Sequence, residues 1–515
     1  MSGSSKPLLA KVHRLRGPIV LAALCVVPLL LWARIASWDT NFGSGFTALT
    51  SVAVLLALAG TSAFALNLVL GARLRPVETL FGGLDRMYAA HRATGKIAFA
   101  LLLGHVVLIL ASRATISAGS ALELLGPGAG ATVFMGVLAF SAMTMSIALT
   151  LFVRLGQEVF VYVQRSFGLV FLAATYHVFT TDAAAAASSA LEVYLAALAT
   201  LGMAAFAYRS LFSSLLVRRR RYRVVEANRL DEFVTEIVME PIGKPLVFVP
   251  GQFVFVNFRS PVLERELKPF ELSIERQVLS IRPGEIANQF HPFSVTSAPG
   301  APQLRITVKA VGDYTRALRL LGSESEAEAV VEGPYGSFSH RSGERSRQIW
   351  IAGGIGVTPF LSMARSLVDE VGPAVDFYYC VEHEEEAHFL EELRAIAGRR
   401  PTFRVTLVPR DRDGFLTAAR LAEEHADLAS ADVFICGPPA MLESLRSQLQ
   451  ASGLPDRQIH TEEFAFARRG PSSTVAGPEP SPRFSDDAVL ALLAAFVFAG
   501  LAVAAGVVAT ELVQG

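Results

Sequence analysis

One stretch decides the fold of the second half of this chain: Ile349-Trp350-Ile351-Ala352-Gly353-Gly354-Ile355-Gly356-Val357-Thr358-Pro359. A short apolar run that ends in glycines is typical of a buried strand, and the Thr-Pro pair favours the start of a helix. Glycines at such a turn let a pyrophosphate approach the backbone, and the free N–H groups of the following helix attract anions. Strand and helix patterns then repeat, so we predict a parallel α/β nucleotide-binding domain over residues 345–467.

Short β-branched and aromatic runs before this domain predict an antiparallel β-barrel. Leu246–Val249 and Phe253–Val256 flank the turn signal Pro250-Gly251, and Leu304–Val308 alternates apolar with polar residues. We assign residues 222–338 to the barrel, with the charged and irregular residues 261–288 as an inserted loop.

Six apolar segments before the barrel can each span a bilayer, which takes about 20 residues. They cover residues 18–36, 46–70, 95–112, 131–152, 160–180 and 191–216. We therefore predict an α-helical six-helix membrane bundle over residues 18–217, after a cytoplasmic tail at 1–17. A Pro-, Gly- and Ser-rich linker at 468–485 leads to an apolar segment at 486–513, which we predict to be an extra, seventh transmembrane helix.

The composition fits a chain that is part membrane and part soluble. Hydrophobic residues make up 52% of it and the mean hydropathy is +0.43, values too high for a soluble globule. The net charge is zero, with no basic cluster of the kind that binds nucleic acid. Cys25, Cys380 and Cys436 are scattered and offer neither a disulfide framework nor a metal pair. Arginine and lysine concentrate in alternate loops, so the positive-inside rule places the soluble half in the cytoplasm.

Three histidines fall in or beside the predicted membrane segments. His91 and His105 are 14 residues apart, which at ~100° per residue brings them to nearly the same face of a helix, about 21 Å apart along its axis. His177 lies well inside the fifth segment, where an ionisable group needs a partner. Neutral imidazole is a good ligand for haem iron, and imidazoles on facing helices can hold a haem inside a bundle. The alternative is that these histidines form hydrogen bonds between helices.

The membrane half resembles the ferric-reductase-type transmembrane domain, and more closely its bacterial NADPH oxidase-like branch. The residues that carry this resemblance are Phe81-Gly82-Gly83-Leu84-Asp85-Arg86-Met87-Tyr88, His91, Gly95, His105, Arg165, Gly168, Phe171 and His177. The resemblance implies two histidine pairs that hold haem b, with one residue of each pair on the third helix and one on the fifth. The fifth-helix pair is usually 13 residues apart, and the residue 13 before His177 is Gln164. An amide is a poor ligand for haem iron. We therefore expect one haem at His105 and His177. On the inner side, a second haem held weakly by His91 is the favoured expectation; recruitment of another ligand and the absence of this haem are the alternatives.

The barrel carries motifs that resemble the FAD site of the ferredoxin-reductase superfamily. His291-Pro292-Phe293-Ser294-Val295-Thr296-Ser297 is similar to its oxidase-type signature, in which the Ser294 hydroxyl approaches the flavin N5 and Phe293 covers the ring. Gly312-Asp313-Tyr314-Thr315 matches the element that meets the FAD pyrophosphate, and Gly333-Pro334-Tyr335-Gly336 closes the barrel. The FAD-binding residues implied are His291, Pro292, Phe293, Ser294, Lys309, Gly312, Tyr314, Thr315 and Gly333.

The α/β half resembles the nicotinamide domain of the same superfamily. The resemblance assigns nucleotide binding to Gly353, Gly354, Gly356, Thr358, Pro359, Cys436, Gly437 and Pro438. It places Cys436 beside the nicotinamide and Phe466 against the isoalloxazine, so Ser294, Cys436 and Phe466 are the expected catalytic residues. Without the resemblance, Cys436 would be interpreted as a small core residue.

The choice between NADPH and NADH depends on the loop after the strand Phe377–Val381. Relatives usually have an arginine there, whereas this chain has Glu382, which would repel a 2′-phosphate and can accept from a ribose hydroxyl. Arg410 or Arg412 can still bind a phosphate. The resemblance slightly favours NADPH as the electron donor, and NADH is the alternative.

Taken as a whole, the resemblance implies an NAD(P)H oxidase or ferric reductase-type enzyme in a bacterial plasma membrane, with cytoplasmic soluble domains. Hydride would pass from NAD(P)H to FAD, and single electrons through haem b to an external acceptor. The acceptor is expected to be dioxygen, which gives superoxide, with ferric chelate as the alternative. Two further hypotheses are a membrane-anchored flavoprotein relay to a protein or quinone partner and a non-catalytic scaffold.

Overall fold

The computed structural model describes residues 6–462 except 36, 153–156, 182–188, 267–270, 275–276, 281–288, 323–324, 369 and 426. The described residues form two compact units, a helical one that ends at Leu216 and a mixed one that begins at Val217 and also includes Gly83–Asp85. The predicted linker at 468–485, the seventh helix at 486–513 and Phe466 lie outside the described residues.

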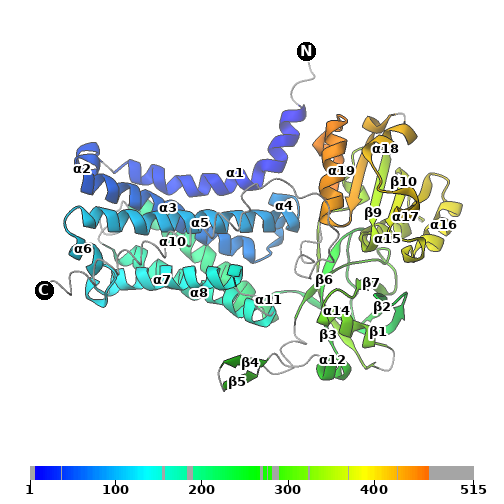
Figure 1. The fold of residues 1–515 in the computed structure, drawn as a ribbon, viewed down its shortest axis with the longest axis horizontal. Coiled ribbons are helices and arrows are strands. Elements are labelled where there is room, and N and C mark those ends of the chain that lie inside the picture. Colours follow the sequence, from blue (N-terminus) through cyan, green and yellow to red (C-terminus); the bar gives the residue numbers. More distant parts are fainter. Residues whose placement is uncertain are drawn as a thin grey trace, which may run out of the picture. The chain divides into compact units, whose positions relative to one another are not determined.

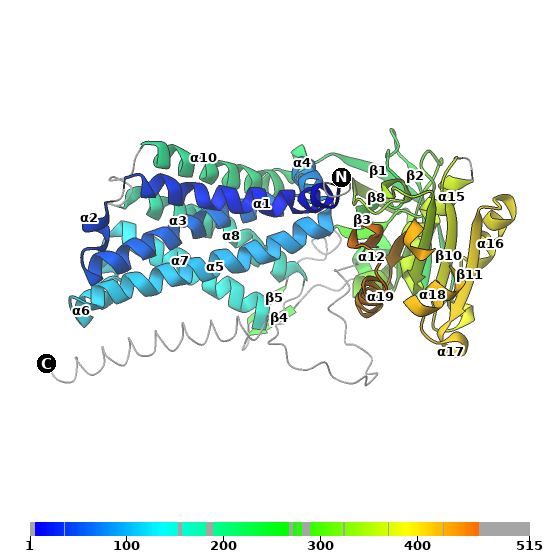
Figure 2. The ribbon, with the colours of Figure 1, turned by 90° about the horizontal axis from the view of Figure 1, so that it is seen from above.

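Long helices make up the first unit and run side by side as a bundle (Figures 1 and 2). They are α1 (Lys6–Ala33), α3 (Gly45–Gly71), α5 (Leu84–Ala114), α7 (Ala131–Phe152), α8 (Gln157–Thr180) and α10 (Ser189–Phe206). Short helices between or after them are α2 (Trp38–Phe42), α4 (Arg75–Phe81), α6 (Ala118–Glu123) and α11 (Ser213–Leu216). Because α1 begins at Lys6, residues 6–17, which the sequence predicts to be a tail, are helical.

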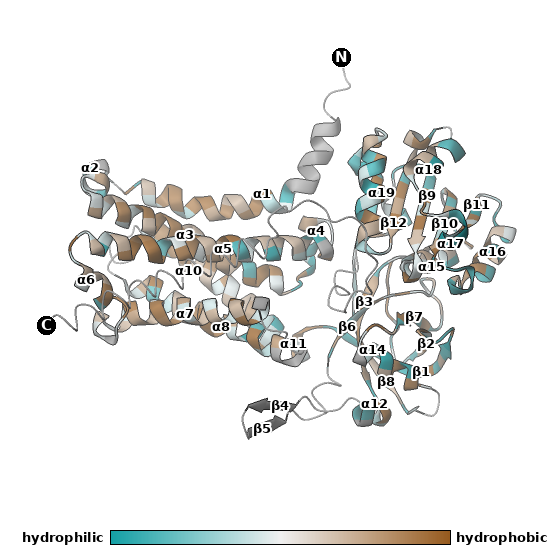
Figure 3. Cartoon of the chain, in the orientation of Figure 1, coloured by the Kyte–Doolittle hydropathy of each residue, from teal (hydrophilic) through white to brown (hydrophobic). Residues whose placement is uncertain are grey.

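Five helices of the described chain are long and apolar enough to cross a membrane. They include Arg16–Ala33, Gly45–Gly71, Arg86–Ala114, Ala131–Thr150 and Ser189–Leu211. The helix α8 is not among these five, since Glu158, Gln164 and Arg165 make it more polar. A multi-pass membrane unit is therefore supported, whereas the count of six spans stays a prediction. Figure 3 shows hydrophobic residues spread along the long helices of this unit.

Small residues and aromatic rings hold these helices together. A Cβ at Gly60 would lie 2.9 Å from Leu102, and one at Gly104 would lie 2.9 Å from Leu56, so glycines let α3 and α5 approach closely. The ring of Phe64 on α3 packs edge-on against Phe171 of α8 at 5.0 Å. Without a hydrophobic drive in lipid, such packing is what associates the helices.

The second unit begins with an antiparallel barrel of six strands in the order β6-β3-β8-β1-β2-β7. The strands are β1 (Arg219–Arg229), β2 (Val234–Pro241), β3 (Phe253–Arg259), β6 (His291–Ser294), β7 (Leu304–Lys309) and β8 (Glu328–Tyr335). A bridge between Val295 and Ile306 joins the two edges and nearly closes the sheet. Alternate residues such as Val254, Val256 and Phe258 fill its core. The antiparallel barrel predicted from the sequence is therefore observed.

Two predictions for the barrel differ from the structure. Leu246–Val249 is not a strand, because prolines flank it and side chains satisfy its backbone. The Leu246 N–H donates to the Tyr222 hydroxyl and the Val249 N–H to Gln252 Oε1, each at 2.8 Å. The segment 261–288 is also more than an irregular loop, since it contains α12 (Pro261–Glu266) and a hairpin of β4 (Glu271–Ile274) and β5 (Gln277–Ser280).

A five-stranded parallel sheet forms the rest of the second unit, in the order β11-β10-β9-β12-β13. Its strands are β9 (Arg347–Gly353), β10 (Ala374–Val381), β11 (Phe403–Pro409), β12 (Ala431–Cys436) and β13 (Ile459–Glu462). Its helices are α15 (Thr358–Leu367), α16 (Leu390–Arg399), α17 (Arg410–Asp413), α18 (Ala418–Glu424) and α19 (Pro439–Ala451). The predicted parallel α/β layout is observed.

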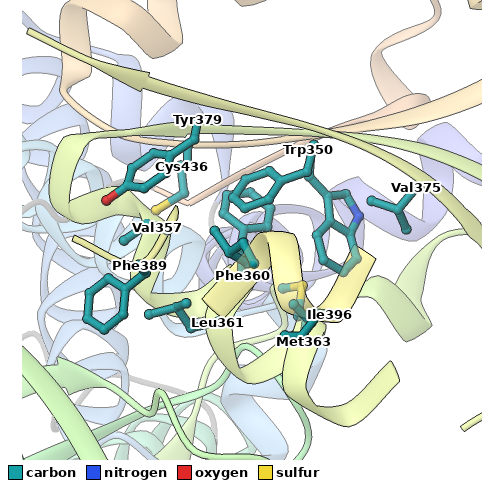
Figure 4. Close-up of a cluster of buried hydrophobic side chains, with 14 of the residues drawn as sticks. Trp350, Val357, Phe360, Leu361, Met363, Val375, Tyr379, Phe389, Ile396 and Cys436 are labelled. Carbon is teal, nitrogen blue, oxygen red and sulfur yellow. The ribbon is translucent and has the colours of Figure 1, made fainter. Parts of the chain in front are cut away.

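Two apolar cores cover the two faces of this sheet. Trp350 and Phe377 point to one face, where both pack with Phe360 of α15. Figure 4 shows Trp350 and Phe360 in this core. Ile349 and Ile351 point to the other, because side chains alternate along a strand. The strand order reverses between β9 and β12, and ligands of such sheets bind at the carboxyl ends of the strands on either side of this reversal.

Candidate functional site

All three candidate haem ligands use one ring nitrogen in the same way. His91 and His105 on α5 place Nδ1 3.1 Å from the Asn67 carbonyl oxygen and 2.9 Å from that of Ala53, both on α3. His177 on α8 places Nδ1 2.8 Å from the Thr132 carbonyl oxygen at the start of α7. A neutral imidazole that donates from Nδ1 has its Nε2 lone pair available for a metal. The chemistry of these three donors therefore fits haem iron.

His105 and His177 are the predicted outer pair. They belong to different helices, α5 and α8. Space for His177 comes from Gly136 on α7, where a Cβ would lie 2.8 Å from the ring. The absence of a side chain at Gly136 therefore leaves room for the His177 ring in its observed position.

His91 has a different environment. The Asn67 amide donates to the His91 carbonyl at 2.6 Å while the Asn67 carbonyl accepts from the His91 ring, so the two residues bind each other twice. Gln164 is exposed on α8, and 13 positions on an ideal helix would not place it on the same face as His177. Within the described residues, no group of three or more His, Cys, Asp or Glu side chains is arranged to hold a metal ion. Sequence analysis missed Asn67, because an asparagine in an apolar helix does not reveal what it contacts.

Two motifs from different parts of the barrel meet at the candidate FAD site. His291 on β6 stacks on Tyr314 of α14 (Asp313–Ala317), with ring centroids 3.8 Å apart and planes at 20°. Burial lowers the pKa of His291 to about 4, so this imidazole is neutral at pH 7. The buried atoms His291 Nε2 and Ser294 Oγ have no hydrogen-bond partner in the protein. Leaving such a group unsatisfied costs about 1–3 kcal/mol, so a bound polar ligand would stabilise the site. These atoms fit the FAD predicted here.

The other predicted FAD residues have varied positions. Phe293 lies in the apolar core of the barrel, 8% exposed, and its place over the flavin ring stays a prediction. Thr315 Oγ1 accepts from the Gly312 N–H at 2.9 Å, so this hydroxyl holds the turn itself. Lys309 is exposed at the end of β7, and Pro292 lies beside Phe255 on the paired strand β3. Gly333 adopts φ 143° where β8 passes β3.

The nucleotide turn after β9 depends on glycine at three positions. A Cβ at Gly353 would lie 2.6 Å from the Met441 sulfur, and one at Gly356 would lie 2.3 Å from the Cys436 carbonyl oxygen. Gly354 has φ 53° and nothing within 4 Å of its Cβ position, so its backbone is open to a ligand. Thr358 and Pro359 begin α15, and the Thr358 hydroxyl donates to the Ile355 carbonyl at 3.0 Å. The turn and the start of α15 form a cradle of the kind that binds a pyrophosphate.

Cys436 ends β12 beside this turn, and Gly437 and Pro438 follow it. Its side chain is fully buried in the same apolar core as Tyr379 and Val357 (Figure 4). Burial raises the pKa of the Cys436 thiol well above its ordinary value, so the group stays protonated at neutral pH. Cys436 is therefore a core residue that also lies next to the nucleotide turn, and its place beside the nicotinamide stays a prediction.

Sequence analysis also missed the contacts between the barrel and the α/β domain. Arg365 on α15 donates to the Thr296 carbonyl of the barrel at 2.8 Å and forms two hydrogen bonds with Glu392 of α16, at 2.7 and 2.8 Å. The Ser362 hydroxyl donates to the Ser297 carbonyl at 2.7 Å. These contacts hold the Gly turn in place relative to the strand that carries the FAD signature. An arginine on an amphipathic helix gives no sequence signal for such a role.

Three domain families match successive parts of the chain. Residues 56–175 match the ferric reductase like transmembrane component, residues 219–339 an FAD-binding domain, and residues 350–447 the oxidoreductase NAD-binding domain.

Similar proteins cover mainly the second unit. The ferredoxin reductase component of 3-ketosteroid-9-alpha-monooxygenase from Rhodococcus rhodochrous is 29% identical over 268 residues, which are 52% of this chain and 70% of that protein. The flavohemoprotein of Chromobacterium violaceum is 28% identical over 265 residues, 48% of this chain and 60% of its own length. The flavohemoglobin structure from Malassezia yamatoensis has 20% identity and a TM-score of 0.41, over 81% of this chain and 96% of that one. The chain spans only 53 to 62% of the length of three further curated relatives.

Proposed function

We propose that this chain, a member of the ferric reductase-like and NADPH oxidase-like family, moves electrons from cytoplasmic NAD(P)H through FAD and haem b to an acceptor across the bacterial plasma membrane. Its FAD-binding and NAD-binding domains make it an NAD(P)H-dependent oxidoreductase. The observation that carries the membrane step is the pair His105 and His177, whose Nδ1 atoms both face main-chain carbonyls of other helices.

In the second unit, the chain binds and aligns the two redox partners. The turn at Gly353, Gly354 and Gly356 and the N-terminus of α15 would hold the pyrophosphate of the nicotinamide cofactor. Ser294 Oγ would donate a hydrogen bond to FAD, while the neutral His291 ring remains stacked on Tyr314. When bound, FAD accepts a hydride and releases electrons one at a time. Buried Cys436 would place no negative charge beside the nicotinamide, because burial raises the pKa of its thiol and keeps it protonated.

In the first unit, the chain would hold haem through Nε2 atoms. His105 and His177 would supply two ligands to one iron, and His91 a single imidazole to an inner iron. The main-chain carbonyls of Ala53, Thr132 and Asn67 fix the ring orientations, which makes each imidazole more basic and a better ligand.

The acceptor we propose is dioxygen, reduced by single electrons so that each NAD(P)H yields two superoxide ions, NAD(P)⁺ and a proton. One observation favours a second candidate, a ferric chelate. Arg113 in the last turn of α5 is exposed over the ring of Phe46, at 5.7 Å, and would attract an anionic chelate. Dismutase-sensitive reduction of cytochrome c supports the oxidase, and dismutase-insensitive reduction of ferric chelate supports the reductase.

An anaerobic NAD(P)H titration of the purified full chain tests the electron path. Flavin absorbance and the haem Soret band should both report reduction in the wild type. His105→Leu or His177→Leu should remove most of the haem signal, while flavin reduction stays within about twofold because the ligands belong to the membrane unit. Tyr176→Phe, beside His177 but exposed, is the matched control and should behave as wild type. A preparation without a Soret band, or flavin reduction without haem reduction, would contradict the proposal and leave a membrane-anchored flavoprotein relay.

A further inference from the structure

Three loops begin side by side at the carboxyl edge of the parallel sheet. Cys380 of β10 pairs with Gly353 of β9, and Val381 of β10 pairs with Pro409 of β11. The residues that follow these pairs are Gly354 in the nucleotide turn, Glu382 after β10 and Arg410 after β11. Glu382 and Arg410 therefore stand at the same level of the edge, and Gly354 stands one residue earlier, after the neighbouring strand β9.

The direction of the bound nucleotide along this edge follows from the strand order. Cys436, expected beside the nicotinamide, ends β12 on one side of β9, whereas β10 and β11 lie on the other side. In doubly wound nucleotide domains, an acidic residue about 20 positions after the glycine turn accepts from the 2′-hydroxyl of the adenosine ribose. Glu382 is 26 positions after Gly356 and directly follows β10, the strand next to β9. The adenosine half of the cofactor would therefore lie over Glu382 and Arg410.

Ion pairs connect the loop after β10 to the loop after β11. Glu382 Oε2 accepts from Arg410 Nη1 at 2.8 Å, and Glu384 Oε2 lies 3.3 Å from Arg412 Nη1. Arg410 also stacks on the ring of Phe415 at 4.6 Å. Both arginines that could bind a 2′-phosphate are thus engaged with carboxylates, and one is also held by an aromatic ring.

The net charge of the two loops also disfavours a bound 2′-phosphate. Six carboxylates stand in these loops against two guanidinium groups, while His383 pairs with Asp411 at 2.9 Å. The carboxylates are Glu382, Glu384, Glu385, Glu386, Asp411 and Asp413. A phosphate carries about −1.5 to −2 charges at pH 7, so this surface repels it. A ribose hydroxyl carries no charge and only needs an acceptor.

We propose that NADH is the preferred electron donor and that Glu382 sets this preference, by accepting from the adenosine 2′-hydroxyl and by keeping Arg410 from a 2′-phosphate. The inference rests on the proposed function of the second unit only, and it reverses the slight preference for NADPH that the family resemblance gives. Glu382 acts on the nucleotide, and Arg410 and Phe415 position its carboxylate.

The test compares second-order rate constants of anaerobic flavin reduction by NADH and by NADPH in the purified full chain. The wild type should prefer NADH by about tenfold or more, since a repelled or unpaired charged group in a binding site costs at least this factor. Glu382→Gln keeps the shape and an acceptor oxygen but removes the charge, and should lower the NADH/NADPH ratio about tenfold, mainly by faster reduction with NADPH. Glu385→Gln removes the same charge from the same exposed run without touching Arg410, and should change the ratio less than about twofold.

Several outcomes would overturn the inference. A wild type that uses NADPH as well as NADH would do so, and so would equal effects of Glu382→Gln and Glu385→Gln. Competition by ADP-ribose and by its 2′-phosphorylated form, read from the same flavin rates, gives an independent measure, and tighter binding of the phosphorylated form would contradict the proposal. Flavin reduction by NADH without haem reduction would refute the transmembrane electron path alone, whereas haem reduction at equal rates by both nucleotides would refute only the donor preference.

Discussion

The nucleotide turn and the three histidines would each hold the cofactor proposed for them, and they would do so by different means. At the turn, the binding groups belong to the backbone, and glycines at 353, 354 and 356 create the space. In the helical unit, the binding groups are side chains, and backbone carbonyls of other helices orient them. A site built from backbone groups can be recognised in a short stretch of sequence. A site built from these side chains forms only once three helices have packed together.

The largest loss of stability is expected at Gly356, where the backbone of the nucleotide turn packs against the backbone at the end of β12. Gly356→Ala would place a Cβ 2.3 Å from the Cys436 carbonyl oxygen, and the strand ends must then move apart, at a cost of about 3 kcal/mol. Gly354→Ala has open space around it and should cost about 1 kcal/mol, through its positive φ alone. Thermal unfolding of the two full-length variants, followed by circular dichroism, measures the difference. Equal destabilisation would show that close packing does not distinguish these glycines.

Acid should weaken the second unit through its buried histidines. Burial lowers the pKa of His340 to about 4, below the ordinary value near 6.5, so the folded state prefers the neutral ring. The stability it contributes is complete above about pH 6.5 and falls as the pH drops toward 4, by about 2 kcal/mol at pH 5. The thermal midpoint of wild type should fall between pH 7 and pH 5, and His340→Gln should reduce this fall. An identical fall in the variant would assign the acid sensitivity to other groups, such as His291 and His425, whose pKa values burial also lowers.

The helical unit offers a glycine test that matches the one in the nucleotide turn. Gly136→Ala would place a Cβ 2.8 Å from the His177 ring and displace a side chain instead of a strand. We expect haem affinity to fall about tenfold, with a shifted Soret band and unchanged flavin reduction. Gly128→Ala, at a position with nothing within 4 Å, is the control and should keep the wild-type spectrum. A normal spectrum in Gly136→Ala would argue that His177 is not an iron ligand.

The smallest effect is expected at Asn67, which holds His91. Asn67→Leu removes the amide that donates to the His91 carbonyl, and we expect several-fold weaker retention of an inner haem. Pyridine haemochrome analysis should give about two haems per chain for wild type and a value closer to one for the variant. Asn67→Gln, which keeps an amide, should give an intermediate value. One haem per wild-type chain would refute the inner haem at His91.

Most of the architecture follows from local patterns. Periodicity and turn residues predict the parallel sheet and the antiparallel barrel, because buried strands and glycine turns have local signatures. They failed at Leu246–Val249, where β-branched residues between two prolines are satisfied by the side chains of Tyr222 and Gln252. The position of Gln164 opposite His91 came from the family resemblance and stays a prediction, since ideal helix geometry does not place residues 164 and 177 on one face.

The sequence by itself determined which cofactors to look for and the order of the domains, since glycine turns, apolar segments and intramembrane histidines are properties of short stretches. Only the tertiary structure decided what each of these groups touches. These contacts join residues 24 to 52 positions apart. They are the hydrogen bonds of the three imidazoles to main-chain carbonyls, the ion pair of Glu382 with Arg410, and the two hydrogen bonds between Asn67 and His91. Contacts over such separations depend on how helices and strands pack, which no local pattern of residues specifies.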